Sequence, residues 1–257
     1  MLYIQMAGLV MALRHRYPYL RFLCSSYRCS SRLPADLTVS VTPAELEAEY
    51  EKNPQMGKGC CESLCIYRAI GQTLPVFQGL IVHAAAVEMN ERVYLFLAKS
   101  GVGKTTHARL WAEVFPGHAR ILNGDKPIIR RLERGWSVWG TPWQGKEDLG
   151  QNRHAPLYAL CFLERASENR IEPLMPEEAL CRLLPQVYLP HTKELLGPCL
   201  DLLADLTAAV PAYRLQCNLH PDAAQVAYDG MRGASPPPSE RTDSYDLSKT
   251  DCSNHRI

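Results

Sequence analysis

One segment of the sequence combines glycine, lysine and threonine at spacings that suit phosphate chemistry. It reads AKSGVGKT and runs from Ala98 to Thr105. Glycines let a backbone curl around phosphate oxygens, and the N–H groups at the start of a helix meet those oxygens with the positive end of the helix dipole. The lysine and threonine that follow supply a cation for the β- and γ-phosphates and a hydroxyl ligand for Mg²⁺. The segment therefore predicts a phosphate-binding loop for a nucleoside triphosphate.

Two side chains of this loop have specific predicted roles. Lys104 is the expected cation and Thr105 the expected Mg²⁺ ligand. Ala98 departs from the usual pattern, which begins with glycine. The alternative is an ordinary strand-to-helix turn with incidental glycines, which would give the lysine no role. The residues predicted to bind the nucleotide are Ser100, Gly101, Val102, Gly103, Lys104, Thr105 and Thr106.

Asp125 is the acidic residue at the end of the next predicted strand, in the segment RILNGDKP. Because the carboxyl ends of neighbouring parallel strands share one edge of a sheet, we expect Asp125 beside the phosphate loop. A carboxylate there could bind Mg²⁺ or accept the proton of an attacking hydroxyl. The alternative is an aspartate that only shapes the turn before Pro127.

His83 lies ten residues before Val93, within the apolar segment LIVHAAAV. If that segment pairs with the strand before the loop, the imidazole would reach the γ-phosphate region or hold Asp125 by a hydrogen bond. A histidine in an apolar run is otherwise a hydrogen-bonded core residue. The predicted catalytic residues are therefore His83, Asp125 and Lys104, and the predicted Mg²⁺ ligands are Thr105 and Asp125.

The hydrophobic pattern predicts the elements that must position these residues. Residues 93–97 (VYLFL) are a short apolar run, as expected of a strand buried on both faces. Residues 105–115 carry apolar residues at helical spacing, and a second strand is expected to end at Asp125. Later elements are expected at 127–143 (a hairpin), 158–163 (a strand), 213–219 (a strand) and from His220 onward (the last helix). Alternating strands and helices predict an α/β core.

The chain divides into three predicted parts. Residues 1–79 begin with an expected strand and contain a helix whose Thr42 and Glu45 fit a capping box, which predicts a small α+β lead-in subdomain. Residues 80–233 form the predicted α/β core. Residues 234–257 are rich in Ser, Pro, Asp and Thr and bury too little apolar surface to offset the entropy of ordering, so a disordered tail is expected.

Composition limits the expected partners. The 28 basic and 27 acidic residues leave a net charge of +1, which offers no broad attraction for nucleic acid or anionic membranes. No segment approaches the ~20 apolar residues that cross a bilayer, and no signal sequence is evident, so a cytoplasmic protein is expected. The ten cysteines are expected to be reduced. Cys60, Cys61 and Cys65 are the best zinc candidates but lack a fourth ligand, and the alternative is a helix with small apolar thiols.

Five segments together carry a family resemblance. They are HAAAV, VYLFLAKSGVGKTTHARLW, ILNGDKPIIR, GTPWQGKEDLGQN and PLYALCFLER, within residues 80–232. They resemble the HPr kinase/phosphorylase-like group, and more closely its short bacterial homologues, some of which accompany peptide-modification genes. The resemblance implies an α/β fold with a P-loop kinase core of the HPr kinase and phosphoenolpyruvate carboxykinase type.

This resemblance also implies an activity, namely phosphoryl transfer from ATP, with Mg²⁺, to a serine-type hydroxyl of a protein or peptide. His83 matches the family's histidine ahead of the loop, and Asp125 matches an acid that serves in proton transfer or Mg²⁺ binding. The family carries two adjacent aspartates there, whereas this chain has Gly124 in place of one, which makes the reverse, phosphorolytic reaction less expected. Lys146 and Asn152 match the phosphate and substrate contacts of the family's second signature.

Three other functions remain open at this point. The missing second aspartate motivates a non-catalytic ATP-binding regulatory module. A kinase for a small molecule differs only in its acceptor, and a carboxykinase-like lyase would need further metal ligands that the sequence does not offer. Related kinases often form hexamers, but this chain lacks the usual length of their N-terminal domain, so a homo-oligomer is left open.

Overall fold

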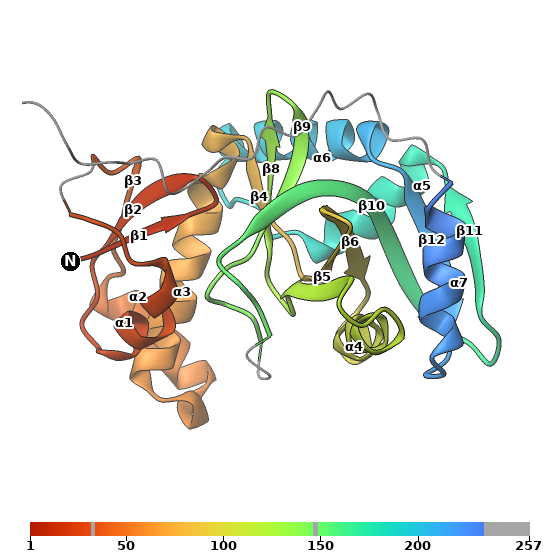
Figure 1. The fold of residues 1–257 in the computed structure, drawn as a ribbon. Coiled ribbons are helices and arrows are strands. Elements are labelled where there is room, and N and C mark those ends of the chain that lie inside the picture. The colour runs from red at the N-terminus through yellow and green to blue at the C-terminus, as the bar shows by residue number, and fades with distance from the viewer. Residues whose placement is uncertain (32–33, 146–148, 234–257) are drawn as a thin grey trace, which may run out of the picture.

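The computed structural model describes residues 1–31, 34–145 and 149–233 of the 257-residue chain. Its strands form two sheets, of which the smaller is N-terminal (Figure 1). The N-terminal elements are β1 (Leu2–Met6), β2 (Leu9–Leu13), β3 (Leu37–Val39), α1 (Tyr19–Leu23), α2 (Pro43–Lys52) and α3 (Lys58–Thr73). One hydrophobic cluster fills the space between this sheet and α3, and it extends to Ile128 and Trp143 of the larger part.

The sequence predicts a single strand at the start of the chain. This prediction is wrong. β1 and β2 are two antiparallel strands joined by a two-residue turn at Ala7 and Gly8, whose φ angles are 54° and 72°. Two consecutive positive φ angles give the turn whose twist matches that of a β-hairpin. The predicted capping box is confirmed, because Thr42 Oγ1 accepts the Glu45 N–H at 3.2 Å and Glu45 Oε2 accepts the Thr42 N–H at 2.7 Å.

The larger sheet holds the remaining strands in the order β4-β8-β9-β10-β6-β5-β7, with β12 beside β10 and β11 beside β12. Its strands are β4 (Gly79–Ile81), β5 (Ala84–Met89), β6 (Arg92–Leu97), β7 (Ala119–Asn123), β8 (Ile128–Leu132), β9 (Gly135–Trp139), β10 (His154–Arg165), β11 (Arg170–Leu174) and β12 (Ala212–Cys217). The long strand β10 is parallel to β6 and β12, and its first residues are antiparallel to β9.

Strand β6, which precedes the glycine-containing loop, and strand β7, which follows the helix after it, are not neighbours. This differs from the prediction of adjacent parallel strands. β5 lies between β6 and β7 and is antiparallel to both. The β5–β6 connection is again a turn of two residues with positive φ, Asn90 and Glu91 at 51° and 60°. Because β5 runs the other way, its beginning, rather than its end, lies at the edge of the sheet where β6 and β7 end.

Helices cover both faces of the larger sheet (Figure 1). They are α4 (Lys104–Val114) and α7 (Asp222–Met231) on one face, and α5 (Pro176–Leu183) and α6 (Lys193–Ala209) on the other. Strand β6 is buried between them: Leu95 and Leu97 belong to the core under α5 and α6, and Tyr94 and Phe96 to the core under α4 and α7. The fold is therefore mixed α/β, with the predicted strand at 93–97 and the helix after it confirmed.

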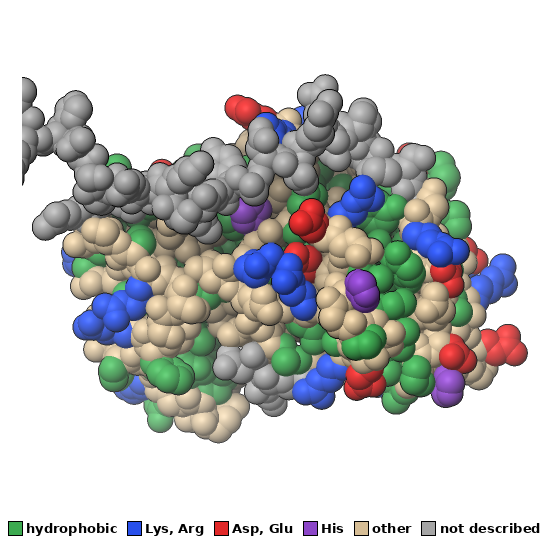
Figure 2. All heavy atoms as spheres, viewed as in Figure 1, with side chains coloured by type: hydrophobic (Ala, Val, Ile, Leu, Met, Phe, Trp, Pro, Cys, Tyr) green, Lys and Arg blue, Asp and Glu red, His purple; other side chains and the backbone are tan. Residues whose placement is uncertain are grey.

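The other predicted elements of the core are also present. The hairpin expected at 127–143 is β8 and β9, and the strands expected at 158–163 and 213–219 are β10 and β12. The predicted tail, 234–257, lies outside the described residues. Within the described part of the chain, no helix combines the length and the apolar character that a bilayer crossing needs. Acidic and basic side chains are interspersed on the face shown in Figure 2.

Candidate functional site

Residues 98–105, here called the glycine loop, connect the buried end of β6 to the first turn of α4. Gly101 and Gly103 have φ angles of 80° and 124°, which residues with a Cβ rarely adopt. A Cβ built at either glycine would meet no atom within 4 Å. The two glycines are thus required by the backbone conformation, and the space over the loop is open. Gly103 is also the N-cap of α4 and offers no side chain to the first N–H groups of that helix.

Lys104 is the first residue of α4 and is only 7% exposed. Its Nζ donates a hydrogen bond to the carbonyl of Ala98 at 2.8 Å, so the ammonium folds back over the loop that contains it. Burial lowers the pKa of Lys104, the carboxylate of Asp125 opposes that effect, and the ammonium of Lys126 adds to it. The loop cation is therefore partly desolvated and lies within electrostatic reach of one carboxylate and a second ammonium.

His83 and Asp125 come together from opposite ends of the β5–β7 segment. His83 lies just before β5, and because Ala84 pairs with Leu97, the next position outward places His83 opposite Ala98. His83 Nε2 lies 3.3 Å from Asp125 Oδ1, and the N–H of Ala84 donates to the carbonyl of Asp125 at 3.0 Å. The backbone N–H of His83 donates to Gln186 O at 2.7 Å. The structure thus brings His83 and Asp125 together at the start of the glycine loop.

The carboxylate of Asp125 is held in its ionised form. Burial raises its pKa, but hydrogen bonds from His83 and Lys126 and the charges of both outweigh that effect and bring the pKa to about 2. Lys126 Nζ contacts Oδ2 while His83 contacts Oδ1, so each carboxylate oxygen has one partner. An aspartate in this state is a weak base and a good anionic ligand.

A buried polar network fixes the turn that carries Asp125. Asn123 and Thr141 are both fully buried. Asn123 Oδ1 accepts the N–H groups of Asp125 and Lys126 at 3.0 Å and 2.8 Å, while its amide donates to Thr141 Oγ1 at 3.1 Å. The carbonyl of Lys126 accepts from Thr141 Oγ1 and from the Tyr67 hydroxyl, each at 2.8 Å. The side-chain acceptor for the N–H groups of this turn is therefore Asn123 rather than Asp125.

The structure gives a steric reason for glycine at position 124, which the sequence alone did not show. A Cβ at this position would lie 3.0 Å from the carbonyl oxygen of Gln144 and 3.3 Å from that of Leu149. The Gly124 N–H also donates to Leu149 O at 2.8 Å. Backbone atoms of Gln144 and Leu149 thus lie over Gly124 and leave little room for a second aspartate there.

Two basic residues of the site were missed by the sequence reasoning. Lys126 follows Asp125 directly and contacts its carboxylate. Arg165, the last residue of β10, donates from Nε to Val102 O at 3.1 Å and from Nη2 to Gly101 O. Arg165 could have been found from the sequence, because it ends a strand that is parallel to β6, and the ends of parallel strands share one edge of the sheet.

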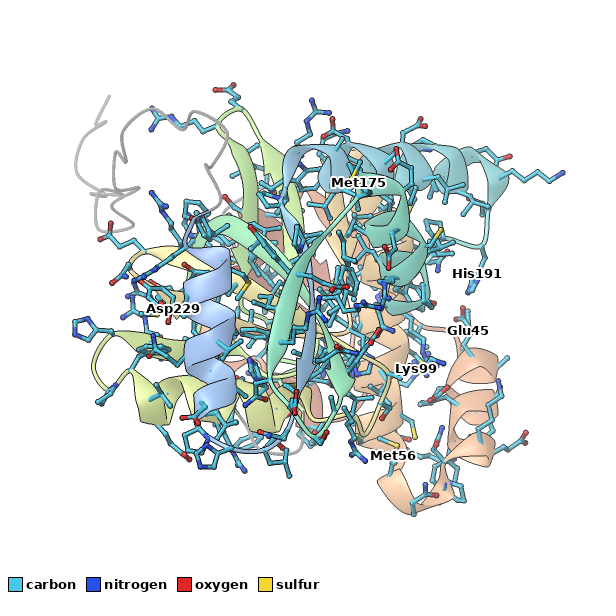
Figure 3. The ribbon with its side chains drawn as sticks, turned by 90° about the vertical axis from the view of Figure 1, so that its right-hand side faces the viewer. Glu45, Met56, Lys99, Met175, His191 and Asp229 are labelled. Atoms are coloured by element: carbon cyan, nitrogen blue, oxygen red, sulfur yellow. The ribbon has the colours of Figure 1, made fainter. Side chains whose placement is uncertain are left out.

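Other predicted residues lie elsewhere or outside the described residues. Lys146 falls in the undescribed segment 146–148. Asn152 donates its amide to Ser26 O at 2.9 Å, which ties it to the N-terminal part rather than to the glycine loop. The cysteines at 60, 61 and 65 lie on α3, and among the described residues no group of three His, Cys, Asp or Glu side chains is placed to hold a metal ion. Figure 3 views the molecule from the side where the exposed side chain of Lys99 marks the start of the glycine loop.

Comparison with known proteins adds only a distant structural likeness. No protein-family model matches the chain, and no curated protein matches its sequence. Among solved structures, the chain is similar to the Hpr(Ser) kinase/phosphatase from Coxiella burnetii, at a TM-score of 0.36 and 9% sequence identity, over 59% of this chain and 93% of that chain. A likeness at this level says nothing about the chemistry of the site.

Proposed function

We propose that this chain is an ATP-dependent phosphotransferase that moves the γ-phosphoryl group to a serine-type hydroxyl of a protein or peptide. The observation that carries the proposal is the grouping of the partly desolvated Lys104 ammonium and the ionised Asp125 carboxylate beside the glycine loop. Phosphate oxygens need clustered N–H groups and a cation, and the attacking hydroxyl needs an acceptor for its proton. This site offers each of those groups.

The donor groups present fit ATP and Mg²⁺. The first N–H groups of α4 and the ammonium of Lys104 suit the phosphate oxygens. The Thr105 hydroxyl and the Asp125 carboxylate are hard oxygen donors, the ligand type that Mg²⁺ prefers. When bound, Mg²⁺ would neutralise charge on the β- and γ-phosphate oxygens. Residues 100–106 would hold the nucleotide, as the sequence predicts, and the rest of the chemistry falls to side chains at the edge of the sheet.

Asp125 would orient the acceptor hydroxyl and take its proton. As the acceptor oxygen forms its bond to the γ-phosphorus, the bond between that phosphorus and the bridging oxygen of the leaving ADP breaks, and the hydroxyl proton passes to Asp125. A carboxylate with a pKa of about 2 is too weak to remove that proton beforehand. It suits a loose transition state, in which the hydroxyl loses its proton late. His83 would hold Oδ1 in place, and Oδ2 would reach the acceptor only when the Lys126 ammonium leaves it.

A non-catalytic ATP-binding module is the second candidate, and one observation favours it. Both oxygens of the single carboxylate already have partners, His83 on Oδ1 and Lys126 on Oδ2. If neither partner yields to an acceptor, the site would bind ATP and report its presence without turnover. The two functions differ in one measurable outcome, the transfer of phosphate.

The test is incubation with γ-labelled ATP and Mg²⁺ alongside candidate peptides encoded by neighbouring genes, with calorimetric titration of ATP in parallel. Lys104→Met keeps the buried apolar stem and removes the charge, and we expect it to lower transfer by roughly 100-fold or more. Arg131→Ala is the matched control, because Arg131 pairs with Asp205 at 3.3 Å on the outer part of β8.

Four outcomes of this experiment distinguish the candidates. Label on a peptide that depends on Lys104 supports the kinase, and label on a free metabolite instead moves the acceptor class to small molecules. Tight ATP binding without transfer or hydrolysis supports the non-catalytic module. Wild-type protein that neither binds nor uses ATP would overturn the proposed function.

A further inference from the structure

We infer that Lys126 is a catalytic residue that contacts the γ-phosphate, as a second cation beside Lys104. The inference rests on the proposed function and assigns that site a residue that the sequence pattern does not supply. It starts from the juxtaposition of Lys126, Asp125 and the glycine loop, and from the way the fold holds the backbone of Lys126.

The backbone of Lys126 is fixed at both of its polar groups. Its N–H donates to Asn123 Oδ1 at 2.8 Å, and its carbonyl accepts from the Tyr67 and Thr141 hydroxyls, each at 2.8 Å. Tyr67 is 4% exposed, and Asn123 and Thr141 are completely buried. A buried polar network of this kind rigidifies what it holds. A solvated surface lysine needs no such support, so the network indicates that the position of residue 126 matters.

The side chain of Lys126 lies against Asp125 and stays partly exposed. Its ammonium contacts Asp125 Oδ2, and its side chain is 34% exposed, so the group lies at the edge of the site and is open to an incoming ligand. The charge of Lys126 also acts on Lys104, whose own ammonium lies against the Ala98 carbonyl. Lys126 thus contacts Asp125 from the turn after β7, and Lys104, on the glycine loop, lies within electrostatic reach of both.

The charge balance of the site favours an anion there. Two lysines and one aspartate leave one uncompensated positive charge among these three side chains. The γ-phosphate is the part of ATP nearest to the group that takes the acceptor proton, because the acceptor oxygen attacks the γ-phosphorus. An ammonium already resting on Asp125 thus needs only a rotation of its flexible stem to reach a γ-phosphate oxygen. That movement would also release Oδ2 of Asp125 for the acceptor hydroxyl.

The competing role for Lys126 is purely structural, as a partner that keeps Asp125 ionised. The two roles differ in how a variant binds ATP and ADP. A contact with the γ-phosphate is lost only from ATP, whereas a structural role changes both nucleotides equally or neither. The comparison needs no acceptor, so it stands even if turnover is never detected.

The experiment measures the dissociation constants of Mg-free ATP and ADP by calorimetry for wild type, Lys126→Met, Lys126→Gln and Lys126→Arg, with Arg131→Ala as the control. For the Met and Gln variants we expect ATP to bind roughly tenfold more weakly, with ADP unchanged within about twofold, since one charge-assisted contact is lost. Lys126→Arg should recover most of the ATP affinity, and the control should match wild type. ADP binding also reports that each variant is folded.

An unchanged ratio of ATP to ADP affinity in both neutral variants would overturn the role of Lys126, and so would an equal loss for the two nucleotides. A failure of the proposed function looks different, because wild type itself would then bind neither nucleotide. If one neutral variant does not fold, the other decides the result. Under turnover conditions the same variants should lose kcat, with Lys126→Arg retaining more of it than Lys126→Met.

Discussion

The Nε2 atom of His83 lies 3.3 Å from Oδ1 of Asp125, and the backbones of the same two segments are joined by the bond from Ala84 N–H to Asp125 O, at 3.0 Å. A side-chain contact and a backbone contact therefore link the start of β5 to the turn after β7. The backbones that carry the imidazole and the carboxylate are therefore held at a fixed separation by the edge of the sheet. This rigidity is what a site needs when its chemistry depends on placement of the reacting groups.

The depressed pKa of Asp125 predicts a loss of stability in acid. The folded pKa of about 2 lies below the ordinary aspartate value of 3.8, so the carboxylate contributes stability that is fully present above pH ~4 and is lost as the pH falls toward 2. The contribution is about 2 kcal/mol, from the size of the shift. Urea denaturation of wild type and Asp125→Asn without Mg²⁺ should show stability curves that converge between pH 4 and pH 2. Parallel curves over that range would contradict the prediction.

Gly124→Asp, which would restore an adjacent pair of aspartates, is expected to destabilise the protein rather than to improve the site. The new Cβ would meet the carbonyl oxygens of Gln144 and Leu149 at 3.0 Å and 3.3 Å, and backbone atoms cannot yield as a side chain does. We expect a loss of about 1–3 kcal/mol, measured by denaturant unfolding.

Gly124→Ala separates the steric cause from charge, since it adds the same Cβ without a carboxylate. Both variants should lose stability, and the aspartate variant should not gain transfer activity. An alanine variant as stable as wild type would show that the segment over Gly124 gives way easily.

Local sequence was enough to predict the glycine loop, the strand before it and the helix after it. Gly101 and Gly103 have the positive φ angles that explain why glycine is required, and the run 93–97 is buried on both faces as an apolar strand should be. These features depend on residues close together in the sequence. Backbone preference and hydrophobic pattern therefore fix them without knowledge of the rest of the chain.

The order and direction of strands were not predictable in the same way. The insertion of antiparallel β5 between β6 and β7 depends on pairing between segments, and the hairpin of β1 and β2 depends on an alanine taking a positive φ before Gly8. The contact of His83 with Asp125 was anticipated only as one of two alternatives. Tyr67, on α3, reaches the carbonyl of Lys126 across a long sequence separation, and nothing in its local sequence marks it.

His107 predicts a second pH dependence that is independent of the proposed function. It is 3% exposed, and burial lowers its pKa from 6.5 to about 4. Because the unfolded chain takes up a proton below pH 6.5 while the folded chain does not, stability should fall from pH 6.5 to pH 4 and change no further below that. The loss is about 3 kcal/mol relative to a variant without this histidine.

His107→Gln is the matched variant, since its side chain retains an acceptor for the Trp111 indole N–H, which donates to His107 Nε2 at 3.2 Å. Denaturant unfolding of the two proteins between pH 7 and pH 4 gives the difference, and carboxylates that titrate in both cancel. If wild type and variant lose stability in parallel over this range, the imidazole is charged in the folded protein and the assignment is wrong.

Arg165→Ala is expected to weaken both nucleotides, in contrast to the variants of Lys126. Arg165 donates to the carbonyls of Val102 and Gly101 and so holds the outer part of the glycine loop in place. Without it the loop must be ordered by the ligand, which lowers the affinity for ATP and ADP together, by roughly threefold to tenfold. Calorimetric titration measures both dissociation constants.

Arg170→Ala is the control for loss of one arginine, because the Arg170 side chain is 75% exposed on β11. A selective loss of ATP binding would assign Arg165 to the γ-phosphate instead, and unchanged affinities would show that the loop holds its shape alone.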